Sequence, residues 1–157
     1  MKSKAYVKCE LGYWELEEEH GKITALNFIG ELVESKKGMP TDTNPILDEG
    51  KKQLEEYFDG KRQEFSLPLH LEGTIFQKKV WQALQEIPYG ATKSYQEVAV
   101  NVGNKNSVRA VGGANHHNPI SIIVPCHRVI GKNGTLVGYG GGLDVKAFLL
   151  GLEARRL

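Results

Sequence analysis

The chain has 157 residues, 40% hydrophobic and 25% charged, a composition typical of one or two soluble globular units that fold without a disulfide or metal. No apolar run approaches the roughly 20 residues that cross a bilayer, and the first residues lack the apolar stretch of a signal peptide, so we expect a cytoplasmic protein without a membrane segment. The net charge of +1 divides unevenly, since residues 1–72 hold ten basic and fifteen acidic side chains and residues 73–157 hold ten and four, which favours a polyanionic partner for the second half.

The first half reads as strands followed by a helix. Three segments alternate apolar and polar side chains and predict an antiparallel meander: residues 4–11, 13–18 and 22–29. Asn44 before Pro45 predicts a capped helix that ends at Asp59. Residues 65–71 form a further extended segment, which Pro68 confines to the edge of the sheet because proline has no N–H to donate.

The pattern changes near residue 73, after which helices dominate. Thr74 predicts the start of a helix whose apolar face includes Ile75 and Trp81. The capping box of Ser94 and Glu97 predicts a second, short helix. A glycine at 103 separates it from a third helix that begins at 106 or 107 and ends near 115. A terminal helix is predicted to be capped by Asp144.

These elements predict an α+β fold of two domains. Residues 1–72 are expected to form a small N-terminal α/β domain with a three-stranded antiparallel sheet. Residues 73–157 are expected to form a mostly helical domain. Its two short helices, joined at a glycine in a basic region, have the outline of a helix-turn-helix, although similar hairpins occur in many proteins that do not bind DNA.

The segment 119–131 carries the strongest candidate for chemistry. Its apolar run, residues 120–124, stops at Pro125, which places Cys126 at the end of a hydrophobic element. A thiol attacks as the thiolate, so its free pKa of about 8.5 has to fall for reaction near neutral pH. The alternative is that Cys126 is a small buried hydrophobic residue, which is the commoner role of a cysteine after an aliphatic run.

Three other residues bear on the choice between a nucleophile and a core cysteine. His127 activates the thiol only if its ring turns toward the sulfur, directly or through a water, which requires a bent backbone here. Glu153 on the last helix is a candidate to orient the imidazole. Arg128 adds positive charge that favours a thiolate or a nearby phosphate. Alternatively, His127 is a hydrogen-bonded structural histidine.

The chain has two cysteines, Cys9 and Cys126, which are far apart in the sequence. Their spacing is unlike that of zinc ligands, and we expect two free thiols in a reducing compartment. We therefore predict no metal site and no cofactor.

The run Pro125 to Ile130, PCHRVI, resembles the active-site signature of the O6-alkylguanine-DNA alkyltransferases. Similar family motifs precede and follow it, and the resemblance covers about residues 74–155. These motifs are Ile87 to Gly90, Ser94-Tyr95, Arg109 to Ala114, Asn118-Pro119, Gly138 to Leu143, Lys146 and Leu152-Glu153.

The resemblance implies a DNA repair reaction. The alkyl group of O6-alkylguanine, and of O4-alkylthymine, would pass to Cys126 irreversibly and once per molecule. It also implies a monomer that binds duplex DNA through the minor groove and flips the damaged nucleotide out of the stack.

Roles follow for the residues around the thiol. The resemblance implies that His127 acts as base through a water, that Glu153 holds its tautomer and that Asn118 ties the turn at the nucleophile to the preceding helix. Tyr95 would donate a proton or hydrogen bond to the departing purine, or would only pack on the core.

Other residues would bind the flipped base. The carbonyls of Cys126 and Val129 would accept from the exocyclic amine of guanine. Backbone amides around Gly140 would meet its O6, where relatives often offer a hydroxyl side chain. Lys146 would supply positive charge, or would be a solvated lysine of the first helical turn.

A third group would bind the duplex. Arg109 would fill the vacated stack, because a guanidinium is planar and always charged. Gly112 and Gly113 would let the DNA approach the helix closely; the alternative is tight packing between helices.

Three other functions compete with this one. A non-catalytic lesion-sensing relative would lack the acceptor cysteine, which this chain keeps. A helix-turn-helix regulator would have no use for Cys126 and His127. A thiol hydrolase using the same pair would turn over many substrate molecules.

Overall fold

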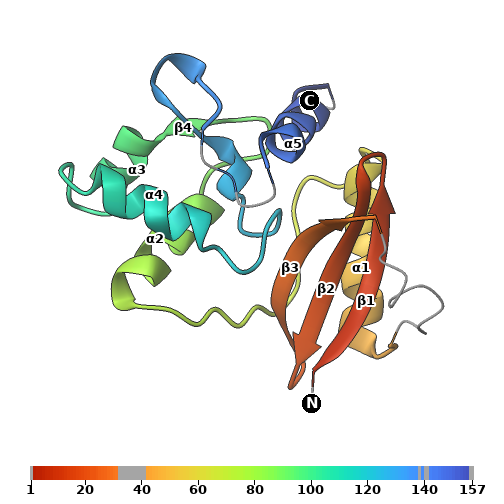
Figure 1. Ribbon diagram of the computed structural model, residues 1–157. Coiled ribbons are helices and arrows are strands. Elements are labelled where there is room, and N and C mark those ends of the chain that lie inside the picture. Colours follow the sequence, from red (N-terminus) through yellow and green to blue (C-terminus); the bar gives the residue numbers. More distant parts are fainter. Residues whose placement is uncertain (1, 32–41, 138, 140–141, 156–157) are drawn as a thin grey trace. The chain divides into compact units, whose positions relative to one another are not determined.

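The structure is a computed structural model that describes residues 2–31, 42–137, 139 and 142–155 (Figure 1). It divides into two compact units, Met1–His70 and Leu71–Leu157. Within the described residues, no helix combines the length and apolar character needed to cross a membrane.

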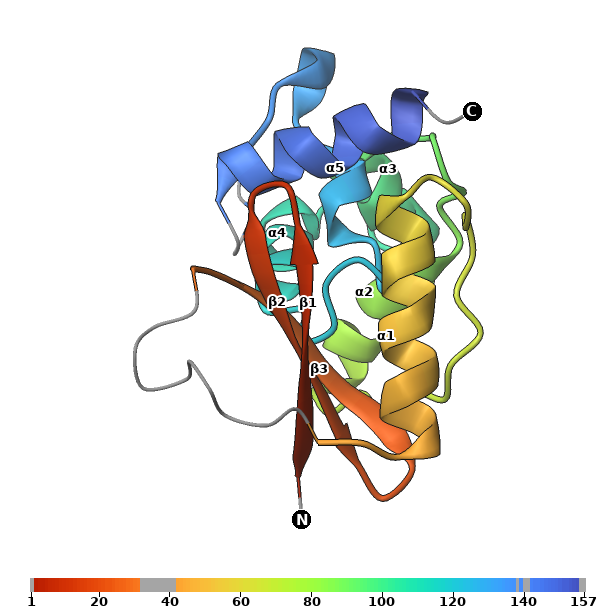
Figure 2. The same ribbon diagram turned by 90° about the vertical axis from the view of Figure 1, so that its right-hand side faces the viewer.

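The first unit is built on the predicted meander. Strands β1 (Ser3–Cys9), β2 (Gly12–Glu19) and β3 (Lys22–Gly30) pair antiparallel in the order β1-β2-β3. Alternate side chains such as Trp14 and Leu16 are fully buried, as the period of two requires. Helix α1 (Pro45–Phe58) packs against the sheet, and Figure 2 shows it running along one face.

The start of α1 follows from its sequence. The side chain of Asn44 accepts a hydrogen bond from the Leu47 amide at 2.9 Å, and Pro45 occupies the first turn, as predicted. The amide of Asn44 also donates to the buried carboxylate of Glu18 at 2.8 Å. The expected edge segment makes a single parallel bridge, between Ile23 and Leu69.

The second unit contains four α-helices among its described residues. They are α2 (Ile75–Gln85), α3 (Tyr95–Asn101), α4 (Val108–His116) and α5 (Leu143–Arg155). Two short parallel strands, β4 (Lys93–Ser94) and β5 (Val129–Ile130), join the start of α3 to the segment after Cys126.

The caps of α2 and α3 explain where these helices begin. Both have complete capping boxes, Thr74 with Gln77 and Ser94 with Glu97, and the second confirms a prediction from the sequence. The expected apolar face of α2 is wrong at Ile75, which is 80% exposed. The prediction is confirmed at Trp81, which belongs to the buried stripe of α2: Val80, Trp81, Ala83 and Leu84.

Helices α3 and α4 form the predicted helix-turn-helix. Gly103 in the connection has φ of +92°, a left-handed conformation that glycine adopts without strain. The indole nitrogen of Trp81 donates to the Ala114 carbonyl at 2.9 Å and ties α2 to α4. The cap predicted at Asp144 is wrong, because α5 begins one residue earlier and the Lys146 amide bonds to the Gly142 carbonyl.

Candidate active site

The backbone around Cys126 is bent. The preceding run is not a strand; Ile122 has φ of +70°, which a β-branched residue adopts only under strain. Residues Cys126–Arg128 then form one turn of 3-10 helix, in which the Arg128 amide donates to the Pro125 carbonyl at 3.0 Å. This turn contacts α2 and α5. A bent backbone is the condition that the sequence analysis set for His127 to activate the Cys126 thiol.

His127 and Arg128 converge on one carboxylate. Nε2 of His127 lies 2.6 Å from Oε2 of Glu153, while Nε and Nη2 of Arg128 donate to its two oxygens at 2.8 and 3.0 Å. Arg128 also donates to the Ile87 carbonyl at 2.7 Å. Its charge therefore balances Glu153, which corrects the expectation that Arg128 serves a thiolate or a phosphate. A buried charge pair with this many hydrogen bonds holds the imidazole in place.

The protonation states follow from these contacts. Burial would raise the pKa of Glu153, but the hydrogen bonds from His127 and Arg128 outweigh it and lower that pKa to about 2. Burial lowers the pKa of His127, an effect that Glu153 only partly reverses. The imidazole is therefore neutral, and because the carboxylate can only accept, the ring proton lies on Nε2.

The other ring nitrogen is available to take a proton. Nδ1 of His127 is buried and has no hydrogen-bond partner among the described residues. A neutral imidazole with one nitrogen fixed on a carboxylate and the other unprotonated is the arrangement of a general base.

Cys126 itself is a buried thiol, 3% exposed. Burial raises its pKa, and hydrogen bonds from Asn118 and Ser121 together with the charge of Lys146 offset only part of that rise. The sequence argument required a lowered pKa, and the structure shows the opposite for the resting protein. The thiol is therefore the favoured form of Cys126 in the resting protein.

Two asparagines brace the turn. The amide of Asn118 donates to the Val124 carbonyl at 2.7 Å and its oxygen accepts from the Ile120 amide at 3.0 Å, so it fixes the bend before Cys126. Asn115, which the sequence analysis did not single out, donates to the Cys126 carbonyl at 3.3 Å. Its signal was an amide side chain four residues after Val111, on the apolar face of α4.

Lys146 and Tyr95 meet at one carbonyl. Nζ of Lys146 donates to the Val137 carbonyl at 2.8 Å and to the Val129 carbonyl at 2.5 Å, and the Tyr95 hydroxyl donates to Val137 at 3.0 Å. Lys146 is fully buried, which rules out the solvated alternative, and burial lowers its pKa to about 8 although the charge of Cys126 opposes this. Tyr95, Lys146 and Cys126 therefore share one electrostatic environment.

The residues predicted to bind the duplex, Arg109, Gly112 and Gly113, all lie on α4. Arg109 is exposed and makes no hydrogen bond or ion pair within the described part of the chain. A Cβ built on Gly112 or Gly113 would meet no atom within 4 Å, so packing between helices does not explain either glycine. Gly140, predicted to contact the O6 atom, lies outside the described residues.

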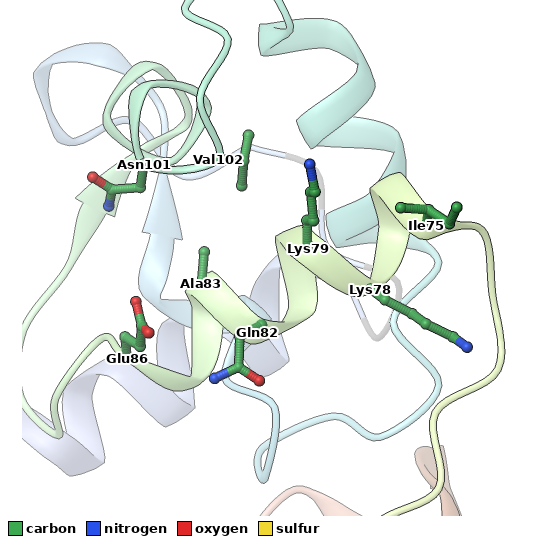
Figure 3. A pocket seen from close by; sticks show the side chains of 8 residues that line it. All are labelled: Ile75, Lys78, Lys79, Gln82, Ala83, Glu86, Asn101 and Val102. Carbon is green, nitrogen blue, oxygen red and sulfur yellow. The ribbon is translucent and has the colours of Figure 1, made fainter.

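A groove of about 560 Å³ lies along α2 in the second unit (Figure 3). It is lined by the outer face of α2, including Ile75, Lys78 and Lys79, and by Asn101 and Val102 at the end of α3. None of the predicted site residues lines it. Among the described residues there is also no cluster of three or more His, Cys, Asp or Glu side chains suited to a metal.

Both halves of the sequence match models of known domains. Residues 75–155 match the 6-O-methylguanine DNA methyltransferase DNA binding domain, and residues 3–71 match the 6-O-methylguanine DNA methyltransferase ribonuclease-like domain.

Individual proteins similar to this chain carry the same family name. The chain is 59% identical to the methylated-DNA–protein-cysteine methyltransferase of Methanosarcina barkeri over 109 residues, 69% of each chain. It is 49% identical to the constitutive enzyme of that name from Bacillus subtilis over 148 residues, 91% of this chain and 90% of the relative. The crystal structure of Mycobacterium tuberculosis OGT in complex with DNA is similar with a TM-score of 0.84 and 44% identity, covering 98% of this chain and 93% of that one.

Proposed function

The chain belongs to the 6-O-methylguanine DNA methyltransferase family, and we propose that it repairs O6-alkylguanine in duplex DNA by moving the alkyl group to Cys126, irreversibly and once per molecule. The observation that carries this proposal is the set of contacts made by His127, the residue that follows Cys126 in the chain. His127 is neutral, bonded through Nε2 to Glu153, and has an unpartnered Nδ1. A non-catalytic DNA-binding protein has no use for a buried base next to a cysteine.

The reaction begins with a proton transfer. Nδ1 of His127, directly or through one water, takes the proton of the Cys126 thiol, and the positive imidazolium that results is stabilised by Glu153. The sulfur then attacks the alkyl carbon in line with its bond to O6. As the new S–C bond forms, the O6–C bond breaks and its electron pair stays with the purine.

The departing base carries the negative charge, and two groups stabilise it. Tyr95 donates a hydrogen bond or proton to the purine ring, and Lys146 supplies positive charge beside it. The guanine leaves with its normal protonation restored. The thioether on Cys126 has no leaving group that water could displace under mild conditions, so the protein is consumed.

Recognition of the base uses backbone groups. Within the chain, the Cys126 carbonyl accepts hydrogen bonds from the Asn115 side chain and from the Val129 amide, and the Val129 carbonyl accepts one from Lys146. A carbonyl oxygen has two lone pairs, so the Val129 carbonyl retains one for the exocyclic amine of guanine, whereas the Cys126 carbonyl would have to share or exchange one of its present bonds to accept from that amine. Amides around Gly140 would bind O6. O4-alkylthymine presents a similarly alkylated exocyclic oxygen but no such amine, so we infer a slower reaction with it.

Access to the buried thiol requires that the nucleotide leave the helix. Arg109 on the exposed face of α4 would take the place of the extruded base in the stack, and Gly112 and Gly113 would allow close approach of the minor groove. The DNA complex of the similar Mycobacterium tuberculosis protein supports DNA as the partner.

A titration tests the proposed reaction. The protein is mixed with increasing amounts of a duplex that contains one O6-methylguanine, and the repaired DNA is counted at completion. We expect a plateau at one repaired base per protein molecule. Repair that continues beyond one equivalent would replace this proposal with a hydrolase that turns over.

Base flipping is tested with two substrates. Arg109→Ala should slow repair of the duplex at least tenfold more than reaction with a free O6-alkylguanine base, whereas Arg109→Lys should fall between it and the natural chain, because lysine keeps the charge but not the planar stacking surface. Equal slowing on both substrates would show that Arg109 acts on the active site rather than on the duplex.

A further inference from the structure

Asn115 is a buried amide side chain on α4, and the reaction described above gives it no role. It is 2% exposed, and Nδ2 donates to the Cys126 carbonyl at 3.3 Å. Because that partner can only accept, the amide nitrogen must face it, which fixes the orientation of the whole amide group. The Asn115 oxygen is then left without a partner among the described residues. Retaining a buried amide with an unsatisfied oxygen is costly and calls for a compensating role.

The same side chain also interacts with the hydroxyl of Tyr95 and lowers the pKa of that phenol, against the rise caused by burial and by Cys126. An amide nitrogen carries two hydrogens, which matches two acceptors, the Cys126 carbonyl and the Tyr95 oxygen. When the tyrosine oxygen accepts from Asn115, the tyrosine's own proton must be donated elsewhere. In this structure it goes to the Val137 carbonyl at 3.0 Å.

We propose that Asn115 is a positioning residue that fixes Tyr95 as a hydrogen-bond donor at a set place relative to the backbone of the nucleophile. This inference rests on the proposed alkyl transfer. When the flipped purine arrives, the Tyr95 hydroxyl redirects its hydrogen bond from the Val137 carbonyl to the base. The amide hydrogen that Asn115 donates to the phenol oxygen then stabilises the negative charge that develops on Tyr95 as it donates its proton. Asn115 touches no reacting atom and acts through Tyr95.

A double-mutant cycle separates this role from simple support of the turn. The variants are Asn115→Leu, Tyr95→Phe and the two combined, each reacted in excess over a duplex with O6-methylguanine under single-turnover conditions. We expect Asn115→Leu to slow methyl transfer roughly tenfold in the natural background, about the effect of one hydrogen bond to a developing charge. In the Tyr95→Phe background, which has no hydroxyl, it should slow transfer less than about twofold.

Equal slowing in both backgrounds would overturn the proposal, because it would show that Asn115 supports only the Cys126 turn. No slowing in either background would overturn it as well. Failure of the natural chain to accept a methyl group at all would instead contradict the proposed function, and that result is read from the natural chain alone.

Two further variants distinguish the proposed role of Asn115 from a general loss of stability. Gln53→Leu is the matched control: it removes a buried amide of the first unit, one that bonds Glu49 and Ser66, and should lower the melting temperature without slowing transfer. Asn115→Ser is small enough to be accommodated and too short to reach both acceptors. Carbon-13 NMR of labelled tyrosine should show a higher pKa for Tyr95 in this variant, and an unchanged pKa would contradict the proposal.

Discussion

The two units of the chain each bury one cysteine, and the two thiols have different neighbours. Cys9 is 8% exposed in β1 and accepts a hydrogen bond from the indole of Trp14 at 3.4 Å. Cys126 is 3% exposed and interacts with Asn118 and with the charge of Lys146. Burial alone does not separate a core thiol from a nucleophile; the groups that can move its proton or hold its charge do.

The buried carboxylates differ in the same way. Glu18 accepts from the Gly21 amide at 2.7 Å and from Asn44 at 2.8 Å, contacts that hold a turn and the start of a helix. Glu153 accepts from two side chains, those of His127 and Arg128, the two residues that follow Cys126 in the chain. The buried carboxylate of the first unit thus stabilises the backbone, whereas that of the second unit fixes the imidazole of His127 in one orientation and tautomer.

The two units also differ in what surrounds the glycines of their helices. A Cβ on Gly50 in α1 would lie 2.8 Å from Leu16, so packing explains that glycine. A Cβ on Gly113 in α4 would meet nothing. A glycine weakens a helix by roughly 0.5–1 kcal/mol relative to alanine, so Gly113 has a cost that its own unit does not explain.

Replacing the two thiols should have the largest effect. Cys126→Ala should abolish methyl transfer. Cys9→Ala should leave the transfer rate within about twofold and cost roughly 1 kcal/mol of stability, the effect of removing a small buried group. Rates come from single-turnover repair and stability from urea unfolding. A comparable loss of transfer in Cys9→Ala would break the distinction between the units.

Replacing the two buried carboxylates, Glu153 and Glu18, should have the second-largest effect. Glu153→Gln removes the anion that orients His127, so transfer should slow by about 10²–10⁴-fold, the range for loss of general-base catalysis. It also leaves Arg128 buried without an anion, at a cost of roughly 3–5 kcal/mol.

Glu18→Gln is the matched control in the first unit, since Glu18 is also buried and hydrogen-bonded. It should destabilise the chain while the transfer rate measured well below the unfolding transition stays unchanged. A slowed rate in this control would mean that loss of stability, rather than loss of the base, accounts for the Glu153 result.

The pH dependence should reveal the buried imidazole. The pKa of His127 lies below its ordinary 6.5, so the folded chain binds fewer protons than the unfolded chain between these two pKa values. Stability should therefore fall as pH drops from 6.5 through the folded pKa, and transfer should fall about tenfold per unit below that pKa as Nδ1 becomes protonated. Rapid-quench rates and unfolding curves at each pH check this. A midpoint at or above 6.5 for the transfer rate would contradict a buried neutral base.

The glycines should give the smallest effect. Gly113→Ala should stabilise the chain by about 0.5–1 kcal/mol and weaken binding to duplex DNA severalfold, because the added methyl enters the contact surface. Gly50→Ala should destabilise by roughly 1 kcal/mol through overpacking and leave DNA binding unchanged.

Gly151→Ala in α5 is the control for helix propensity, since a Cβ there also meets nothing. It should stabilise the chain without changing the DNA affinity measured by fluorescence anisotropy. Unaltered binding by Gly113→Ala would show that this face of α4 does not approach DNA closely.

Local signals explain which parts of the fold were predictable. The meander, the cap at Asn44 and the capping box at Ser94 depend on residues within a few positions of one another, and all three are confirmed. Ile75 and Asp144 were placed wrongly because side-chain packing and the preceding backbone, rather than residue type, decide which face is buried and where a helix begins.

Fewer features of the candidate active site than of the fold could be predicted from the sequence. Glu153 was proposed as the partner of His127, and the structure places them in contact. The attachment of Arg128 to Glu153, the burial of Lys146 and the raised pKa of Cys126 all depend on contacts between residues far apart in the chain. No local pattern encodes such contacts. Asn115 alone left a local trace, as a polar residue on an apolar helix face.

The most direct test of the distinction between the two thiols is to locate the transferred group. The protein is incubated with an excess of duplex containing O6-methylguanine, digested, and its two cysteine peptides are analysed by mass spectrometry. The account predicts one methyl group per chain, on the peptide of Cys126, with Cys9 unmodified. A methyl group on Cys9, or repaired DNA beside unmodified protein, would contradict it.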